Sequence, residues 1–181
     1  GLAVWDAVWA AGQDHGLIPV GIGVYGTTGR LEKGYRAYGP ELETEFYAVE
    51  AGMVTKKVKD ADFIGKEAHL RHREETPAAT MCLLTVDDHT SSTGEKRYMM
   101  GGEPILTKDG QPITDAHGRR SYVTSAGSGP SVGKHILMTY LPPEYSAPGT
   151  HLVVEYLGEQ YPVTVTGSGA LFDPNNDRIL S

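Results

Sequence analysis

The chain has 181 residues, 39% of them hydrophobic, and its formal net charge at pH 7 is −7. This length fits one medium domain or one and a half small ones, and the apolar content is too high for a disordered chain. The scattered positive residues argue against nucleic acid as a partner, because binding phosphates requires a concentrated basic face. No apolar run reaches the length of a membrane span, and we expect no signal peptide. A single cysteine, Cys82, excludes an intrachain disulfide and suits the reducing cytoplasm.

The first part of the chain, to about residue 75, has the pattern of helices and loops. Apolar side chains recur at helical spacing and predict an amphipathic helix over residues 2–14, with Trp5 and Trp9 on one face. Residues 22–36 are ambiguous, because a leucine and a glutamate favour helix whereas four glycines oppose it. We therefore expect either a helix or a loop there.

A second helix is predicted over residues 63–74, with an aspartate before it and Pro77 beyond its end. After Pro77 the pattern changes to short apolar runs separated by turn residues, which is typical of a β-barrel or sandwich. The predicted strands are residues 80–86, 103–106, 120–125, 135–141, 152–156 and 161–166. Hairpin turns are expected at residues 108–110 and 157–159.

Several patterns that could carry chemistry have simpler structural interpretations. The string Gly21–Gly26 reads G-x-G-x-x-G, but no strand precedes it and no βαβ unit follows, which argues against a dinucleotide site. His69 and His72 lie three residues apart without further metal ligands, so a surface pair is predicted. Cys82 lies in an apolar run and is expected to be a buried structural thiol.

Two further groups of polar residues are weighed in the same way. The serines at 125, 128 and 131 lack the spacing of a nucleophile elbow, so we interpret Gly127–Gly129 as a turn. The lysines at 56, 57 and 59 form the densest basic patch, either a solvated face or an anchor for an anionic ligand tail. The residue patterns alone identify neither a catalytic residue nor a metal site.

Four groups of motifs follow one another along the chain. They are RLEKGYRAYG at 30–39 with EAGM at 50–53; DFIGKEA at 62–68; GGEPI at 101–105 with YVTSA at 122–126 and PSVGK at 130–134; and LFDP at 171–174. In this order they resemble the glycine-cleavage T-protein (aminomethyltransferase) superfamily. The sequences of these motifs are most similar to the C-terminal, folate-binding part of dimethylglycine and sarcosine dehydrogenases or oxidases.

The resemblance implies an α+β fold in which a truncated folate-binding α/β subdomain precedes a small antiparallel β-barrel. Residues 1–76 would form the first part and residues 80–181 the barrel. Members of this superfamily transfer a one-carbon unit from an amine or ether to tetrahydrofolate, and in the dehydrogenase branch a flavin domain first oxidises the N-methyl group. The family's catalytic aspartate would lie upstream, so we expect the isolated chain to be inactive and its partner to be the missing N-terminal domains or a subunit that carries them.

Three residues are implied to contact folate, namely Tyr25, Thr27 and Thr55. Gly26 and Thr27 stand where T-proteins carry an arginine–aspartate pair, and Thr55 stands where many members place an aromatic ring against the folate. These departures favour the alternative hypothesis, in which the chain is a non-catalytic interaction or regulatory module with a degenerate folate-binding fold.

Two other pairs match motifs without an expected catalytic role. Arg30 and Glu32 fit the family pattern and are interpreted as a helix-surface or interdomain ion pair. Lys134 and His135 follow a glycine-rich loop and are expected to pack at the edge of the barrel.

Overall fold

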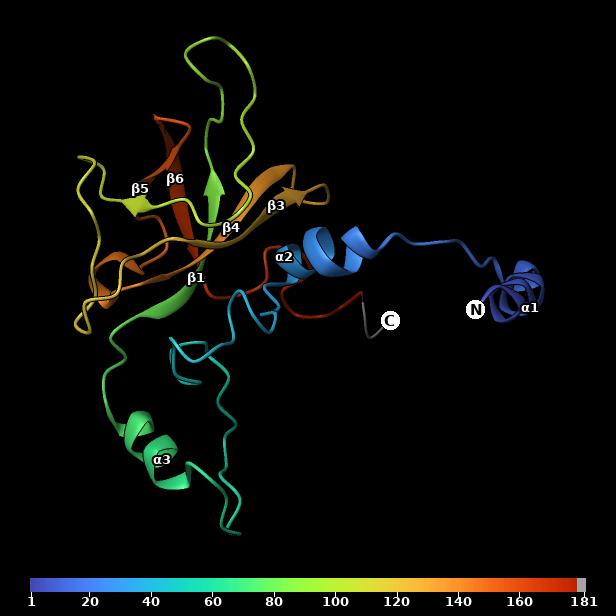
Figure 1. Ribbon diagram of the computed structural model, residues 1–181, viewed down its shortest axis with the longest axis horizontal. Helices are drawn as coiled ribbons and strands as arrows, with labels where there is room; N and C mark the ends of the chain where they lie inside the picture. Colours follow the sequence, from blue (N-terminus) through green and yellow to red (C-terminus); the bar gives the residue numbers. More distant parts are fainter. Residues whose placement is uncertain (179–181) are drawn as a thin grey trace.

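The computed structural model describes residues 1–178. Its body is a curled antiparallel sheet, from which helical segments project in two directions (Figure 1). The strands are β1 (Thr80–Val86), β2 (Ile105–Leu106), β3 (Val123–Gly129), β4 (Lys134–Leu141), β5 (His151–Tyr156) and β6 (Glu159–Gly167). Their order in the sheet is β2-β5-β6-β1-β4-β3.

The sheet curls far enough for its two edges to approach each other. Beside the edge strands β2 and β3, backbone bonds join residues 102–105 to residues 121–123, among them Ile105 N to Ser121 O at 3.0 Å and Val123 N to Glu103 O at 2.8 Å. These bonds supply partners for backbone groups that an open sheet edge leaves unpaired. The expected α+β fold with an antiparallel barrel is confirmed as a curled six-stranded half-barrel.

The central strands β1 and β4 are buried on both faces, which explains their nearly continuous apolar sequences. One face of each strand contributes to the core inside the curl, where Leu84 and Leu137 meet side chains from the other strands. The opposite face supports a second apolar cluster. Its buried members are Leu31, Phe46, Ala51, Ala79, Met81, Leu83, Ile136, Met138 and Tyr140. Strands β5 and β6 are buried mainly at alternate positions, as expected for strands with one solvated face.

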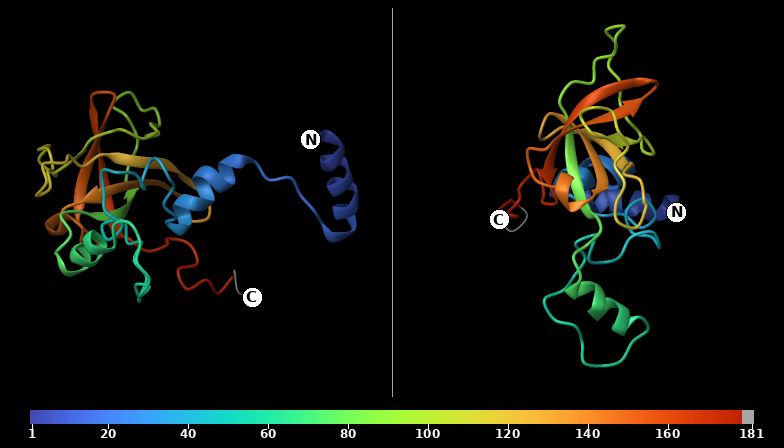
Figure 2. Two further views of the ribbon diagram at one scale, coloured as in Figure 1. Left: turned by 60° about the horizontal axis from the view of Figure 1, so that its bottom comes forward. Right: turned by 90° about the vertical axis from the view of Figure 1, so that its left-hand side faces the viewer.

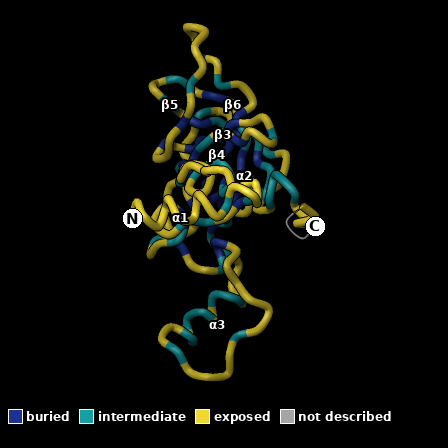
Figure 3. The backbone as a smooth tube through the Cα atoms, turned by 90° about the vertical axis from the view of Figure 1, so that its right-hand side faces the viewer, coloured by how far each residue is buried: buried dark blue, intermediate teal, exposed yellow. Residues whose placement is uncertain are grey.

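The segment 31–51 therefore packs on the outside of the half-barrel. Figure 3 shows the buried backbone concentrated at the sheet, with the outlying segments largely exposed. Phe46 stacks on Tyr140 of β4 with ring centroids 3.6 Å apart. Leu31 is fully buried in the second cluster. The predicted division between residues 1–76 and 80–181 remains a prediction; this packing shows that the two segments share a core.

The helical segments are α1 (Leu2–Gly12), α2 (Gly29–Lys33) and α3 (Lys66–Glu74), with short 3₁₀ turns at Gln13–His15 and Pro143–Tyr145 and a π-helical turn at Val24–Thr28. The helices predicted over 2–14 and 63–74 are thus confirmed, the second beginning three residues later. The ambiguous region 22–36 is helical from 22 to 33, and Gly34 ends it with a left-handed φ of 67°. No helix within residues 1–178 is long and apolar enough to cross a membrane.

Neither α1 nor α3 contains a buried residue. Figure 2 shows α1 at the end of an extended connection and α3 on a separate projection away from the sheet. Trp5 and Trp9 of α1 stack with centroids 6.1 Å apart, yet Trp5 is 56% exposed. The apolar face predicted for this helix is therefore present but not covered by the rest of residues 1–178.

The strand predictions are accurate for β1, β4, β5 and β6; β2 is limited to two of the predicted residues 103–106, and β3 is present but displaced. That strand was expected over residues 120–125 and instead extends from Val123 to Gly129. The stretch Gly127–Gly129, interpreted as a turn, pairs with Lys134–Ile136 of β4. A Cβ on Gly127 would lie 2.8 Å from Leu31 Cδ1, so the glycine permits close packing of α2 against the strand.

Candidate functional site

A cavity of about 510 Å³ lies along the π-helical turn, α2 and the segment that follows them. Its lining combines three cations with three tyrosines, namely Arg30, Lys33, Arg36, Tyr25, Tyr35 and Tyr38. Tyr25 and Tyr38 are largely exposed, at 80% and 91%. The site therefore offers aromatic faces for an approaching ligand, and its polar character depends on what the three cations already contact.

Arg30 connects α2 to the half-barrel. Its guanidinium forms an ion pair with Glu41 Oε2 at 2.8 Å and donates to Ser125 Oγ of β3 at 2.9 Å. Glu41 is fully buried, and its other oxygen accepts a hydrogen bond from Thr124 Oγ1 at 2.8 Å. The interpretation of Arg30 as half of an ion pair is thus confirmed, with Glu41 rather than Glu32 as its partner. Glu32 instead accepts a hydrogen bond from the Ser131 backbone N–H at 2.6 Å.

The other two cations of the cavity are also engaged. Lys33 Nζ donates to the Asp173 carbonyl at 2.6 Å and to Asn176 Oδ1 at 2.8 Å, which attaches α2 to the C-terminal segment. Arg36 donates to the carbonyls of Gly34 and Ala51 at 2.6 and 2.9 Å. Because all three cations hold protein groups, the cavity is organised by internal contacts and has no cation reserved for a ligand.

A second buried network was not found from the sequence. Arg119 donates from Nε to Asp115 Oδ2 at 2.6 Å and forms an ion pair with Glu50, while its guanidinium carbon lies 4.4 Å from the centre of the Phe46 ring. Glu50 also accepts from the Ala79 backbone N–H at 3.2 Å. This network fixes the EAGM motif against the barrel. No spacing rule could have revealed it, because Arg119 and Glu50 are 69 residues apart.

The structure places the three expected folate residues in different surroundings. Tyr25 lines the 510 Å³ cavity, whereas Thr27 lies against β3, where its Cγ2 would be 3.1 Å from a Cβ on Gly127. Thr55 lines a separate cavity of about 370 Å³ and donates from Oγ1 to the Lys57 carbonyl at 2.6 Å. Tyr25 and Thr27 are neighbours on one helical turn, but Thr55 is not brought into the cavity of Tyr25.

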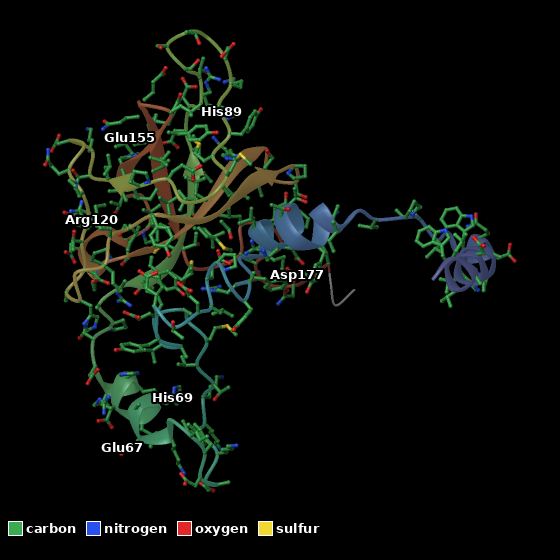
Figure 4. The ribbon with its side chains drawn as sticks, in the orientation of Figure 1. Glu67, His69, His89, Arg120, Glu155 and Asp177 are labelled. Carbon is green, nitrogen blue, oxygen red and sulfur yellow. The ribbon has the colours of Figure 1, made fainter. Side chains whose placement is uncertain are left out.

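The remaining candidate groups behave as structural residues. Cys82 is buried, and burial raises the pKa of its thiol to about 12, so the thiol is protonated at neutral pH. His72 stacks on Tyr47 with centroids 3.8 Å apart. His69 lies on α3, far from the sheet (Figure 4). Within residues 1–178, no group of three or more histidine, cysteine or acidic side chains could hold a metal ion.

Comparison with known families explains the order of the motifs. The family model of the GCVT N-terminal domain matches residues 1–59, and that of the glycine cleavage T-protein C-terminal barrel domain matches residues 89–173. The chain belongs to the glycine-cleavage T-protein superfamily. The second match includes every strand from β2 to β6, in agreement with the observed half-barrel.

Individual relatives agree with this assignment. The aminomethyltransferase of Halothermothrix orenii is 34% identical over 156 residues, which cover 83% of this chain and 38% of the relative. That of Saccharopolyspora erythraea is 33% identical, with 90% and 41% covered. The crystal structure of the aminomethyltransferase T from Bartonella henselae superimposes with a TM-score of 0.62 at 24% identity, covering 76% of this chain and 36% of that one. The chain thus spans about two fifths of the length of the curated relatives it matches.

Proposed function

We propose that this chain forms the C-terminal part of an enzyme that transfers a one-carbon group from an amine to tetrahydrofolate. The observation that carries the proposal is the pair of T-protein matches, which follow each other in family order over residues 1–59 and 89–173. The Arg30–Ser125 and Arg119–Glu50 contacts support it, because they hold the first matched segment on the barrel. The chain's own role in this proposal is to shape and support one wall of the folate site.

Tyr25, Thr27 and Thr55 are the proposed folate contacts. Tyr25 offers an exposed aromatic face, and the adjacent Gly26, whose Cβ position has no atom within 4 Å, leaves space for a flat ring. Thr55 lies in a different cavity from Tyr25. One folate molecule can therefore contact both residues only if upstream parts of the parent join the two cavities into one site. A pocket that buries most of a ligand requires such additional walls.

The apolar face of α1 supports the need for an upstream part. A cavity of about 170 Å³ beside this helix is lined by apolar side chains, among them Trp5, Trp9 and Ile18. Ile18 is 72% exposed, and exposed apolar clusters of this kind are typical of surfaces that pack on another segment or domain. The proposed partner is the N-terminal part of the parent enzyme, on the same chain or on a separate subunit.

The proposed parent is a dimethylglycine or sarcosine dehydrogenase-like enzyme, because the motif sequences at 30–39 and 122–134 resemble those of these dehydrogenases. Sequencing the open reading frame upstream of the Gly1 codon tests this choice of parent. A flavin-binding domain followed by a T-protein N-terminal half is expected; a T-protein half without a flavin domain would contradict the dehydrogenase parent and leave an aminomethyltransferase.

Calorimetric titration of the parent with 5-formyltetrahydrofolate tests the folate proposal. We expect Tyr25→Ala to weaken binding by about ten-fold, the loss expected when one stacking contact of roughly 1.4 kcal/mol is removed. Lys108→Ala, an exposed change in the β2–β3 connection, is the matched control and should bind as the parent does. A folded parent that binds no reduced folate would contradict the proposal.

A further inference from the structure

A second polar cavity, of about 330 Å³, lies at one end of the half-barrel and is separate from the two cavities that hold the proposed folate contacts. It is bounded by the end of β1, the loop that follows it and the β3–β4 turn. Its titratable side chains are Asp87, His89, Lys96, Tyr98, Lys134 and His135. Figure 4 places His89 on the loop that follows β1, at the opposite end of the molecule from His69 on α3.

His135 has a fixed hydrogen-bonding role on one ring nitrogen and an unused lone pair on the other. The side chain is only 6% exposed, and Nε2 lies 3.1 Å from the Met99 carbonyl oxygen. Because a carbonyl only accepts, Nε2 must carry the proton. Burial lowers the pKa of His135, which favours the neutral ring, so Nδ1 is a bare acceptor. This buried Nδ1 has no hydrogen-bond partner among residues 1–178.

His89, next to His135, also has a buried ring nitrogen without a hydrogen-bond partner. This atom is its Nδ1, which has no partner in the part of the chain that the structure describes. The two imidazole rings are 6.2 Å apart with an interplanar angle of 23°. Tyr98 packs edge-on against both rings, at 4.7 and 5.3 Å, and is half exposed. A rotation of Tyr98 is the simplest movement that would open the two nitrogens to the cavity.

The charged groups around these rings have opposite signs. Lys134 is exposed and has no carboxylate partner within residues 1–178. Lys96 is already engaged, donating to Thr90 Oγ1 at 2.7 Å with Asp88 3.8 Å away. Asp87 accepts from Thr164 Oγ1 through Oδ2 at 2.8 Å, which leaves its other oxygen available. The cavity therefore offers one unpaired cation beside two acceptors, the Asp87 carboxylate and the Nδ1 atom of His135.

We propose that this cavity binds a free α-amino acid, with the ligand carboxylate on Lys134 and its ammonium donating to Asp87 and, once Tyr98 has rotated, to the Nδ1 atom of His135. A simple anion satisfies Lys134 but presents lone pairs to the bare Nδ1 atom of His135, whereas a zwitterion satisfies both groups. A metal ion is the less suitable ligand, because no group of three metal-binding side chains is formed within residues 1–178.

An NMR titration of the ¹⁵N-labelled 181-residue chain with glycine tests the proposal. Saturable shifts of the His89 and His135 imidazole nitrogens are expected. Lys134→Gln should weaken glycine binding by about ten-fold, as expected for the loss of one charge-assisted hydrogen bond. The lysine is exposed, so the fold should be retained. Lys108→Gln removes the same charge from an exposed turn that does not line the cavity, and should leave the affinity unchanged.

Acetate, glycolate and methylamine are the comparison ligands, because each lacks one of the two ligand charges. Weaker binding of all three than of glycine supports the zwitterion. Acetate or glycolate that binds as tightly as glycine would overturn the proposal, since the ammonium would then contribute nothing. The absence of saturable glycine shifts, or imidazole shifts that occur with Zn²⁺ and not with glycine, would also overturn it.

Discussion

Arg30 of α2 and the fully buried Glu41 form an ion pair of 2.8 Å that also reaches β3 through Ser125. The pair lies where the segment 31–51 packs on the outer face of the half-barrel. Its position explains how a short, glycine-flanked helix of five residues is held in place, because isolated helices of this length are not stable in water. The wall of the proposed folate cavity thus depends on a contact inside the protein.

Replacing Arg30 should therefore destabilise the chain strongly. Arg30→Met leaves the Glu41 carboxylate buried without its cation, which typically costs about 3–5 kcal/mol. Arg71→Met is the matched control, because its pair with Glu75 is more than half exposed and contributes about 0–0.5 kcal/mol. Urea unfolding of both variants measures the difference. A loss below about 1 kcal/mol for Arg30→Met would show that Glu41 has other means of stabilisation.

The close approach of α2 to β3 gives a second prediction. An alanine Cβ at position 127 would lie 2.8 Å from Leu31 Cδ1 and 3.1 Å from Thr27 Cγ2, so both side chains must move. Gly127→Ala should lower the unfolding free energy by about 1–3 kcal/mol, the usual range for overpacking. Gly94→Ala is not a suitable comparison because its φ is positive, whereas Gly26→Ala meets no atom within 4 Å and serves as the control. Equal stability of the two variants in urea would contradict the close packing.

The sequence predicted the parts of the fold that local patterns determine. Strand β1 is found at the predicted residues 80–86, and the expected turn at 157–159 has left-handed φ angles at Leu157 and Gly158 of 53° and 78°, which suit a two-residue hairpin. It failed for β3, since the glycines at 127 and 129 indicate a loop by local preference. Gly127 allows close packing with Leu31 of α2, and such a long-range contact has no local signature.

The candidate sites were predicted less well for the same reason. The motif at 30–39 led to the superfamily and to Tyr25, but the networks centred on Glu41 and Arg119 depend on contacts between residues 11, 69 and 83 positions apart. The histidine pair that the sequence singled out, His69 and His72, lies on α3 without further metal ligands among the described residues. His89 and His135, the pair that shares a cavity, are 46 residues apart, and no sequence motif links them.

The buried His135 should make stability depend on pH. Burial lowers its folded-state pKa below the unfolded value of about 6.5, so the unfolded chain binds the proton more readily. The free energy of unfolding is therefore highest above pH 6.5, where the ring is neutral in both states. It decreases as the pH falls below 6.5, by up to about 1.4 kcal/mol per pH unit, because the unfolded chain takes up the proton first. Urea unfolding at pH 7.5 and 5.0 should show a smaller pH-dependent loss for His135→Phe. The exposed His15→Gln should retain the full loss, and a matching loss in all three proteins would refute this assignment.

The isolated 181-residue chain should not demethylate dimethylglycine or sarcosine in the presence of tetrahydrofolate. General acid–base assistance to one-carbon transfer requires a positioned carboxylate. The resemblance places the family's catalytic aspartate outside this sequence, and the chain spans about two fifths of its relatives. The purified chain is assayed for formaldehyde and for 5,10-methylenetetrahydrofolate, with the full parent as the positive control. Turnover by the chain without a partner would show that its own residues provide the catalysis.

Thr55→Trp in the full-length parent tests whether the second cavity belongs to the folate site. Thr55 is exposed in a cavity that also contains Lys57, Lys59 and Phe63, with the Lys59 ammonium 5.0 Å from the Phe63 ring centre. A tryptophan there restores the aromatic ring that many relatives carry, and one stacking contact contributes about 1 kcal/mol, or roughly a five-fold gain in affinity. Calorimetry with 5-formyltetrahydrofolate measures the change.

The control for this gain is Thr93→Trp, which places the same ring on an exposed loop of the barrel that lines neither cavity. If only Thr55→Trp strengthens binding, the folate site must extend from Tyr25 to the 55–63 segment, and upstream parts of the parent must join the two cavities. If Tyr25→Ala weakens binding while Thr55→Trp changes nothing in a folded protein, the folate contacts the α2 cavity alone. Thr55 then belongs to a separate surface, and its proposed role in folate binding is wrong.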